Sequence, residues 1–245
     1  LTHPLFDSIT ARVLRLAGRP IWQTHERSPE QTIILTRILK AVRFTERPVV
    51  ERPVVERPVV VIDLDDTLFS MHARNIAIFR EYGRQRGVPL MELIGPEHLT
   101  SWKKETVLVD NLGLDRAWFK QHETEIEEFW RGRFFTNPYI VYDLPVPGAA
   151  DYVRSLRRAG AHVVYLSGRP EATMREGTLK SLRRHHFPVP GRERVTLMMR
   201  TPAFDPVYRA GMPAVEIIRN AHRSDVSFKE AAAGQIRLLG NVVAS

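Results

Sequence analysis

The sequence predicts an α/β fold built on a parallel sheet, and two kinds of pattern lead to this prediction. Short runs rich in apolar residues occur at residues 59–62, 161–166, 195–199 and 241–244, and the first is entirely β-branched. An unbroken apolar run is typical of a strand that is buried on both faces, as in a parallel sheet. The segments around these runs carry apolar residues at helical spacing instead. We therefore expect a parallel sheet with helices around it.

Composition limits the class of protein. The 245 residues suit one large domain or a core with an insert, and 43% hydrophobic with 26% charged residues is ordinary for a soluble globular protein. No stretch approaches the roughly 20 apolar residues of a membrane helix, and no secretory signal is visible, so we expect a cytoplasmic protein without membrane contact. The absence of cysteine excludes disulfide bonds, thiolate metal sites and a cysteine nucleophile.

The net charge of +8 indicates a surface that attracts phosphorylated or polyanionic ligands. The basic residues are spread along the chain and belong to no recognised nucleic-acid-binding module, so we do not expect a nucleic-acid partner. The chain begins at Leu1 and not at methionine, so we expect its natural start to lie further upstream.

Residues 1–57 are interpreted as a basic helical extension followed by a linker. Apolar residues recur at helical spacing as far as Leu16. A second helix is expected to start with Ser28 as its N-cap and Pro29 at its first position. Its buried face would consist either of Ile34, Ile38 and Val42 or of Leu35 and Leu39.

A pentapeptide, Glu-Arg-Pro-Val-Val, then occurs three times, at residues 46–50, 51–55 and 56–60. Three copies of five residues are too few and too short for a solenoid. The recurring proline excludes a helix and interrupts strand pairing. We interpret the first two copies as an extended linker and the third as the start of the first strand.

Clustered carboxylates follow that first strand directly. Asp63 and Asp65 stand two residues apart, where the chain leaves the strand. The carboxyl ends of parallel strands are where open α/β sheets bind ligands. Two close carboxylates repel each other and favour a cation, and hard oxygen ligands suit Mg²⁺. The alternative is an acidic turn that only ends a strand.

This stretch resembles the first motif, Asp-x-Asp-x-Thr, of the haloacid dehalogenase-like (HAD) superfamily, here Asp63, Asp65 and Thr67. The resemblance implies a Rossmann-like three-layer α/β/α core around a central parallel sheet. It implies that Asp63 attacks a phosphoryl group to form an aspartyl-phosphate, which divides one difficult displacement into two steps. Asp65 would protonate the leaving alcohol and then activate water. Asp63 and Asp65 would hold Mg²⁺, and Thr67 would contact the phosphate.

Residues 71–143 are expected to form a mostly α-helical insert, and residues 58–70 with 144–245 the core. One helix is expected around residues 73–82 and a stronger one at 114–134, whose aromatic stripe is better explained as core than as a ligand site. In the superfamily this position holds a mobile helical cap that sets substrate choice. A lid is physically sensible, because exclusion of water protects an aspartyl-phosphate.

The second strand runs into Ser167, Gly168, Arg169 and Pro170. A hydroxyl followed by glycine at a strand end can offer side-chain and backbone donors to a phosphate. This resembles the superfamily's second motif, with Ser167 and Gly168 as phosphate-binding residues and Arg169 as an additional charge. The alternative is an ordinary strand-to-helix turn.

A lysine is the third motif of the superfamily, and Lys229 is the expected one, on a helix that we expect to open at Ser227. Its ammonium would neutralise the nucleophile and the phosphoryl oxygens. Lys180 is the competing candidate. The fourth motif, acidic residues beyond the last strand, is absent from this chain, and Asp205 and Asp225 stand in the wrong places to replace it. We expect that motif to follow Ser245 in the natural protein.

Together these patterns predict a Mg²⁺-dependent phosphomonoester hydrolase that acts on a small phosphorylated metabolite. A protein that keeps the fold for binding or regulation without catalysis is the first alternative, because the fourth motif is absent. A phosphatase of nucleic-acid ends is the second, and it depends only on the basic charge.

Overall fold

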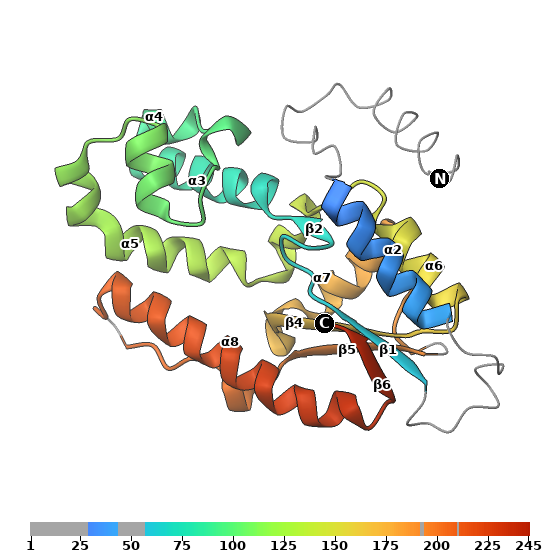
Figure 1. Cartoon of the computed structure of the whole chain (residues 1–245). Helices are drawn as coiled ribbons and strands as arrows, with labels where there is room; N and C mark the ends of the chain where they lie inside the picture. Colours follow the sequence, from blue (N-terminus) through green and yellow to red (C-terminus); the bar gives the residue numbers. More distant parts are fainter. Residues whose placement is uncertain (1–28, 44–56, 192–193, 210) are drawn as a thin grey trace.

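The computed structural model describes residues 29–43, 57–191, 194–209 and 211–245. The predictions that fall outside these ranges are those for the N-cap Ser28, the helix before it and the first two copies of the pentapeptide. The described chain forms a three-layer α/β/α core with a helical lobe beside it (Figure 1). The predicted fold class is confirmed.

The central sheet has four parallel strands in the order β5-β4-β1-β6. Each predicted strand is present: β1 (Pro58–Ile62), β4 (His162–Pro170), β5 (Val195–Arg200) and β6 (Asn241–Ala244). β1 lies between β4 and β6, so its end is central on the carboxyl edge of the sheet.

Alternating residues of the central strands divide the core into two apolar layers. Val60 and Val163 belong to the larger cluster, with α2 (Pro29–Arg43), α6 (Ala149–Arg158) and α7 (Glu171–Arg184). Val59 and Val164 belong to the other cluster, which they form with residues of α8 (Ala214–Arg237). Figure 1 shows α2 beside α6 on one side of the sheet and α8 along the other.

The helical insert leaves and rejoins the core through an antiparallel two-stranded ribbon of β2 (Phe69–Ser70) and β3 (Leu144–Pro145). Its two long helices are α3 (His72–Arg86) and α5 (Arg116–Phe134), and an aromatic contact between Tyr82 and Phe129, with ring centroids 5.0 Å apart, joins them. Asp115 is the N-cap of α5, because its carboxylate accepts the Trp118 amide at 2.7 Å. The insert comprises α3 (His72–Arg86), α4 (Pro89–Glu92), η4 (Pro96–His98), the π-helical turn η5 (Thr106–Asn111), α5 (Arg116–Phe134) and η6 (Asn137–Tyr142).

Two predicted boundaries are wrong. The second strand was expected to end at Leu166, but β4 continues through Ser167 to Pro170, because β5 pairs with it over this length. The last helix was expected to open at Ser227, but α8 begins at Ala214. The polar residues that suggested a later start lie within α8, where the Ser224 hydroxyl donates a hydrogen bond to the Phe204 carbonyl.

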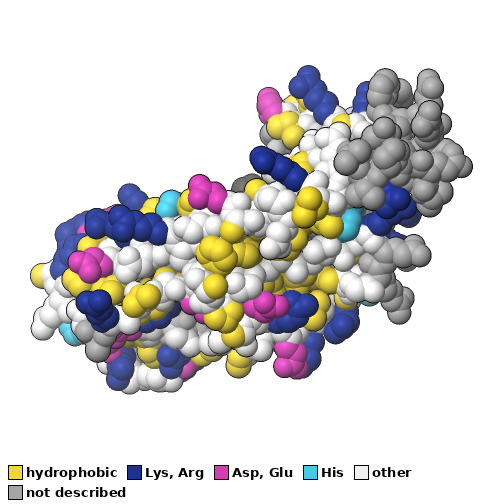
Figure 2. Space-filling model, turned by 90° about the horizontal axis from the view of Figure 1, so that it is seen from below, with side chains coloured by type: hydrophobic (Ala, Val, Ile, Leu, Met, Phe, Trp, Pro, Cys, Tyr) yellow, Lys and Arg dark blue, Asp and Glu magenta, His cyan; other side chains and the backbone are white. Residues whose placement is uncertain are grey.

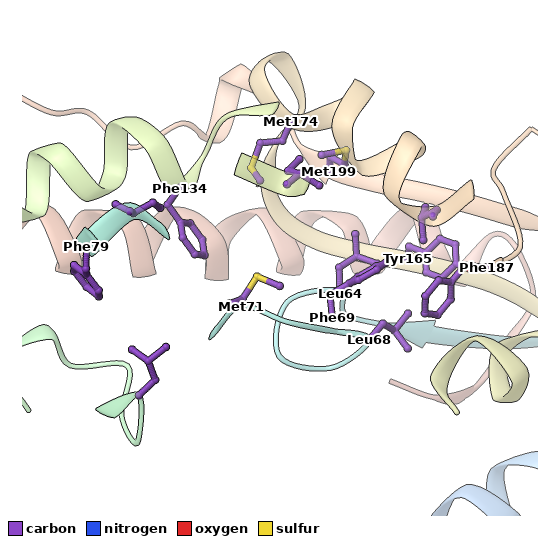
Figure 3. Packing of buried hydrophobic residues seen from close by; sticks show 14 of the residues in the cluster. Leu64, Leu68, Phe69, Met71, Phe79, Phe134, Tyr165, Met174, Phe187 and Met199 are labelled. Atoms are coloured by element: carbon purple, nitrogen blue, oxygen red, sulfur yellow. The ribbon is translucent and has the colours of Figure 1, made fainter. Parts of the chain in front are cut away.

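Two side-chain expectations are also corrected. Ile34 is 55% exposed, whereas Val42 is fully buried, so the inward face of α2 turns from Leu35 through Ile38 and Leu39 to Val42. The adjacent His185 and His186 lack the spacing of a zinc pair, so the sequence predicts them on the surface, but His185 is half-buried with its ring 5.9 Å from that of Phe69. Figure 3 shows Phe69 close to Leu64, Tyr165 and Phe187 in this part of the core.

The surface agrees with the dispersed charge of the sequence. On the face that is seen from below, lysine and arginine side chains are spread out and hydrophobic side chains lie between them (Figure 2). Within the described ranges, no helix has the length and apolar character that crossing a membrane requires.

Replacing Val42 by alanine should lower the free energy of unfolding by about 2 kcal/mol, because two buried methyl groups are lost from α2 and a cavity remains. The matched control is Ile34→Ala on the same helix, which should change it by less than about 0.5 kcal/mol because Ile34 is exposed. Urea denaturation measures both. Equal losses would contradict the orientation of α2.

Lowering the pH should destabilise the protein through two histidines. Burial lowers the pKa of His162 and of His185 below the ordinary value of 6.5. The unfolded chain therefore takes up these protons at higher pH than the folded chain, so the free energy of unfolding should fall as the pH falls below about 6.5. Urea denaturation between pH 7 and pH 5 measures this slope, which His162→Gln should reduce and the exposed control His222→Gln should not. Equal slopes in the wild type and His162→Gln would contradict it.

Candidate active site

A tight turn at the end of β1 carries the two predicted catalytic aspartates. The carbonyl oxygen of the buried Leu64 accepts amide N–H groups from Leu68 and Phe69, both at 2.9 Å. The turn folds back because Leu64, Leu68 and Phe69 are all buried in the core. Asp63 and Asp65, on either side of Leu64, stay partly exposed at the carboxyl edge of the sheet.

Asp63 and Lys229 form the contact at the centre of the site. The Lys229 Nζ donates to Asp63 Oδ2 at 2.8 Å, although the two residues lie 166 positions apart in the chain. Asp63 Oδ1 accepts the amide of Leu64 at 2.7 Å. Both side chains keep about a third of their surface exposed, 37% for Asp63 and 34% for Lys229, so the contact is accessible to a ligand. Lys180, the competing candidate, is 72% exposed and pairs with Glu176.

Asp225 is a second carboxylate beside Lys229, and this pairing was not predicted from the sequence. Its Oδ2 lies 3.1 Å from Lys229 Nζ, one helical turn away on α8. Burial by itself lowers the pKa of Lys229, but Asp63 and Asp225 outweigh burial and raise it, so the ammonium form is favoured. Asp225 thus lies beside the candidate site as a partner of Lys229, and the expectation that it does not replace the fourth motif stays a prediction. The i, i+4 spacing of an acid and a lysine was the signal that could have found it. Asp205 instead pairs with Arg200 at 3.2 Å.

Ser167 and Gly168 lie on β4, which pairs with β1 in the sheet. Ser167 is fully buried, and its hydroxyl oxygen accepts the Arg169 amide at 3.3 Å. Gly168 faces α8 so closely that an added Cβ would lie 2.0 Å from Asp225 Oδ1. Only glycine therefore lets α8 approach this strand with Asp225 in its present place.

Thr67 is exposed on the turn after β1, and its amide donates to the Leu64 carbonyl at 3.4 Å. Among the described residues, no hydrogen bond joins its hydroxyl to Asp63, Ser167 or Lys229. These three residues therefore do not hold the Thr67 hydroxyl, and its contact with phosphate stays a prediction.

Asp65 is held by arginines. Arg169 donates from Nε to Asp65 Oδ1 at 2.9 Å and from Nη2 to the same oxygen, and Arg74 Nη2 lies 4.0 Å from it. Burial by itself raises the pKa of Asp65, but Arg169 and Arg74 outweigh burial and lower it. Asp65 and Asp63, two residues apart, therefore have different partners: guanidinium groups for one and an ammonium group for the other.

Asp143 and Arg74 extend this contact into the helical insert, and sequence reasoning missed both. Asp143, just before β3, pairs with Arg169 at 2.7 Å and with Arg74 through both carboxylate oxygens. Burial raises the pKa of Asp143, against the opposing effect of the two arginines. Arg74 lies one helical turn before the buried Ile78, so its place on the apolar face of α3 was the available signal.

The arrangement suits a small anionic ligand at the edge of the sheet. Asp63 supplies an exposed carboxylate beside an ammonium group, and Ser167 and Gly168 lie on the adjacent strand. In the ranges that the structure describes, no three acidic, histidine or cysteine residues come together as a complete metal site. A hollow of about 360 Å³ lies apart from these residues, between α3 and η6, and is lined by Ala77, Arg80, Glu81, Arg84, Pro138, Tyr139 and Tyr142.

Comparison with known proteins adds no assignment. No protein-family model matches the sequence, and no curated protein matches it closely enough to count as a relative. The chemistry of the site is therefore argued from its own residues.

Replacing Gly168 by alanine should lower the free energy of unfolding by about 1–3 kcal/mol, because the new methyl group must displace the Asp225 carboxylate. The loss should be smaller when Asp225 is also replaced by alanine, since the clash is then removed. Urea denaturation of the single and double variants measures this coupling. Gly132→Ala is the control, because open space surrounds it. Equal losses for Gly168→Ala in both backgrounds would contradict the close approach of α8.

Proposed function

We propose that the protein is a Mg²⁺-dependent phosphomonoester hydrolase of the HAD-like superfamily, acting through an aspartyl-phosphate on Asp63. The contact between Asp63 and Lys229 carries this proposal. It joins the carboxylate that resembles the first motif to the lysine proposed for the third, on the sheet edge that also bears Asp65 and Ser167.

Asp63 is suited to be the nucleophile. Its two oxygens are oriented by the Leu64 amide and the Lys229 ammonium, and the side chain remains partly exposed. A carboxylate and a phosphate repel each other, so a cation beside both lowers the barrier to attack. Lys229 can provide this charge because nearby carboxylates keep it in the ammonium form.

The reaction would take place in two steps. An Asp63 oxygen attacks phosphorus, the ester P–O bond breaks, and the leaving alkoxide takes a proton from Asp65. Asp65 then accepts a proton from water as the water oxygen attacks the aspartyl-phosphate. Inorganic phosphate leaves, and the Asp63 carboxylate and the Asp65 proton are restored.

The ionisation of Asp65 must change when the substrate binds. Arg169 and Arg74 lower the pKa of Asp65 against the effect of burial, which favours the carboxylate. A phosphate dianion nearby favours the protonated carboxyl, because like charges disfavour ionisation. Substrate binding would therefore help Asp65 to carry the proton that the first step consumes.

Phosphate contacts are expected from the hydroxyl groups of Ser167 and Thr67, the backbone N–H of Gly168 and the Lys229 ammonium. The first of these groups lies on β4, which pairs with β1, and the last lies on α8 in contact with Asp63. Donors that are fixed by the fold before the substrate binds stabilise developing charge without reorganisation. The helical insert beside this edge is the proposed cap over a small phosphorylated metabolite.

The donor set of the turn fits Mg²⁺ in part. The Asp63 carboxylate is exposed and offers hard oxygen atoms, and the Asp65 backbone carbonyl would be the second ligand. The Asp65 side chain is held by Arg169, so its carboxylate is less suited to the metal. Mg²⁺ commonly takes only one or two protein carboxylates and keeps several waters. When bound, the ion would neutralise charge on the phosphoryl oxygens.

Replacing Asp63 by asparagine should reduce turnover of p-nitrophenyl phosphate with Mg²⁺ at least about 10³-fold, because an amide cannot form the intermediate. Acid quenching of the wild type with ³²P-labelled substrate should trap a phosphorylated protein, and Asp63→Asn should trap none. The assay measures released nitrophenolate and protein-bound label.

The matched control is Asp110→Asn, which removes a carboxylate from an exposed position on the insert and should keep wild-type turnover. Hydrolysis by Asp63→Asn at the wild-type rate would overturn the proposal. An inactive wild type that still binds phosphate or a phosphate ester would favour the binding protein instead.

A further inference from the structure

Four side chains form a mostly buried ion network between the core and the helical insert: Asp65, Arg169, Asp143 and Arg74. The side chains of Arg74, Asp143 and Arg169 are fully buried, and that of Asp65 is 27% exposed. Two carboxylates and two guanidinium groups balance in charge. Burial makes this pairing costly to disturb, because removal of one member leaves a charge without its partner.

The hydrogen bonds to Asp65 all reach the same oxygen. Nε and Nη2 of Arg169 both donate to Oδ1, and Arg74 is also nearest to Oδ1. The described part of the chain provides no hydrogen bond to Oδ2. The network therefore fixes one oxygen of Asp65 and leaves the other for a ligand.

Arg169 is itself fixed from two sides. Its Nη1 donates to the hydroxyl of the buried Thr178 on α7 at 3.1 Å, and its Nη2 donates to Asp143 at 2.7 Å. Every nitrogen of the guanidinium group thus has a partner, which leaves it no freedom to turn. The fixed guanidinium group of Arg169 therefore determines the position of the Asp65 carboxylate.

Asp143 connects the same group to the insert. It pairs with Arg74, whose Nη1 donates to the Phe134 carbonyl at the end of α5 and whose guanidinium lies 4.5 Å from the Phe134 ring. One contiguous set of contacts therefore leads from Asp65 in the core to α3 and α5 in the insert. Asp143 lies at the junction, directly before the β3 strand that leads back to the core.

We propose that Asp143 and Arg169 are positioning residues that direct Asp65 Oδ2 toward the leaving group, and that Arg74 makes this placement depend on the seating of the insert. This inference rests on the proposed phosphatase function. It adds two residues that act through Asp65 without touching substrate, and a route by which the insert controls proton transfer.

The test compares substrates that differ in their need for a proton. An alkyl phosphate has a poor leaving group and needs a proton from Asp65, whereas p-nitrophenyl phosphate has a good leaving group and does not. The ratio of kcat/KM for the two substrates reports the first step alone. Asp143→Asn and Arg169→Lys should lower the alkyl-to-aryl ratio about 10²-fold, the order of a typical general-acid contribution. Thr178→Val removes one hydrogen bond to Arg169 and should lower it about threefold.

Glu127→Gln is the matched control. Glu127 forms another buried ion pair of the insert, 2.6 Å from Lys104, and belongs to no part of the network. It should lower stability while leaving the alkyl-to-aryl ratio unchanged. A purely structural role for the network would make Asp143→Asn behave in the same way, which would overturn the proposal.

Crystal structures of Arg169→Lys and Thr178→Val provide a readout that does not depend on activity. A displaced Asp65 side chain is expected in Arg169→Lys, and a smaller shift in Thr178→Val, which keeps all four charges and should fold. An unmoved Asp65 in both, or an unchanged ratio in active variants, would overturn the inference. Absence of phosphatase activity in the wild type, together with a displaced Asp65, would count against the proposed function alone.

Discussion

Parallel pairing of β1 with β4 is the constraint on which the site depends. The register places Ile62 beside Tyr165, so the turn that carries Asp63 and Asp65 emerges next to the segment that carries Ser167. A slip of one residue would exchange the two faces of the strand and send buried side chains to the wrong layer. The valine run that fixes this register is therefore also what brings the polar groups together.

Asp63 and Asp65 lie close together in the turn but have different charged partners. Asp63 faces a single ammonium group and remains exposed, while Asp65 is held by a guanidinium group that is itself buried. An ammonium group is a point charge that can shift from a carboxylate to an arriving phosphate, whereas a fully paired guanidinium group holds one geometry. A lysine is therefore suited to position 229, where it would contact the substrate. An arginine is suited to position 169, where it holds a neighbouring side chain in place.

The sequence alone predicted the features that depend on local residue patterns. It did not predict the features that depend on contacts between residues far apart in the chain. Runs rich in apolar residues predict the four strands, and consecutive residues are buried in β1 and β4 at the centre of the sheet. The start of α8 was missed because Ser227 resembles a helix cap in isolation, although it lies within a longer amphipathic helix. Arg74 and Asp143 were not proposed because 69 residues separate them, and an arginine on an apolar helix face indicates a buried partner without identifying it.

Asp225 shows a further limit, since its meaning depends on a glycine. The carboxylate can lie beside Lys229 because Gly168 has no side chain in the space that it occupies. α8 can then approach β4, and this approach brings Lys229 to Asp63. Gly168 was predicted from the sequence as a backbone donor to phosphate. In the structure, the absence of a side chain at this position also makes room for the Asp225 carboxylate. This absence therefore lets the helix that carries Lys229 lie against the strand next to Asp63.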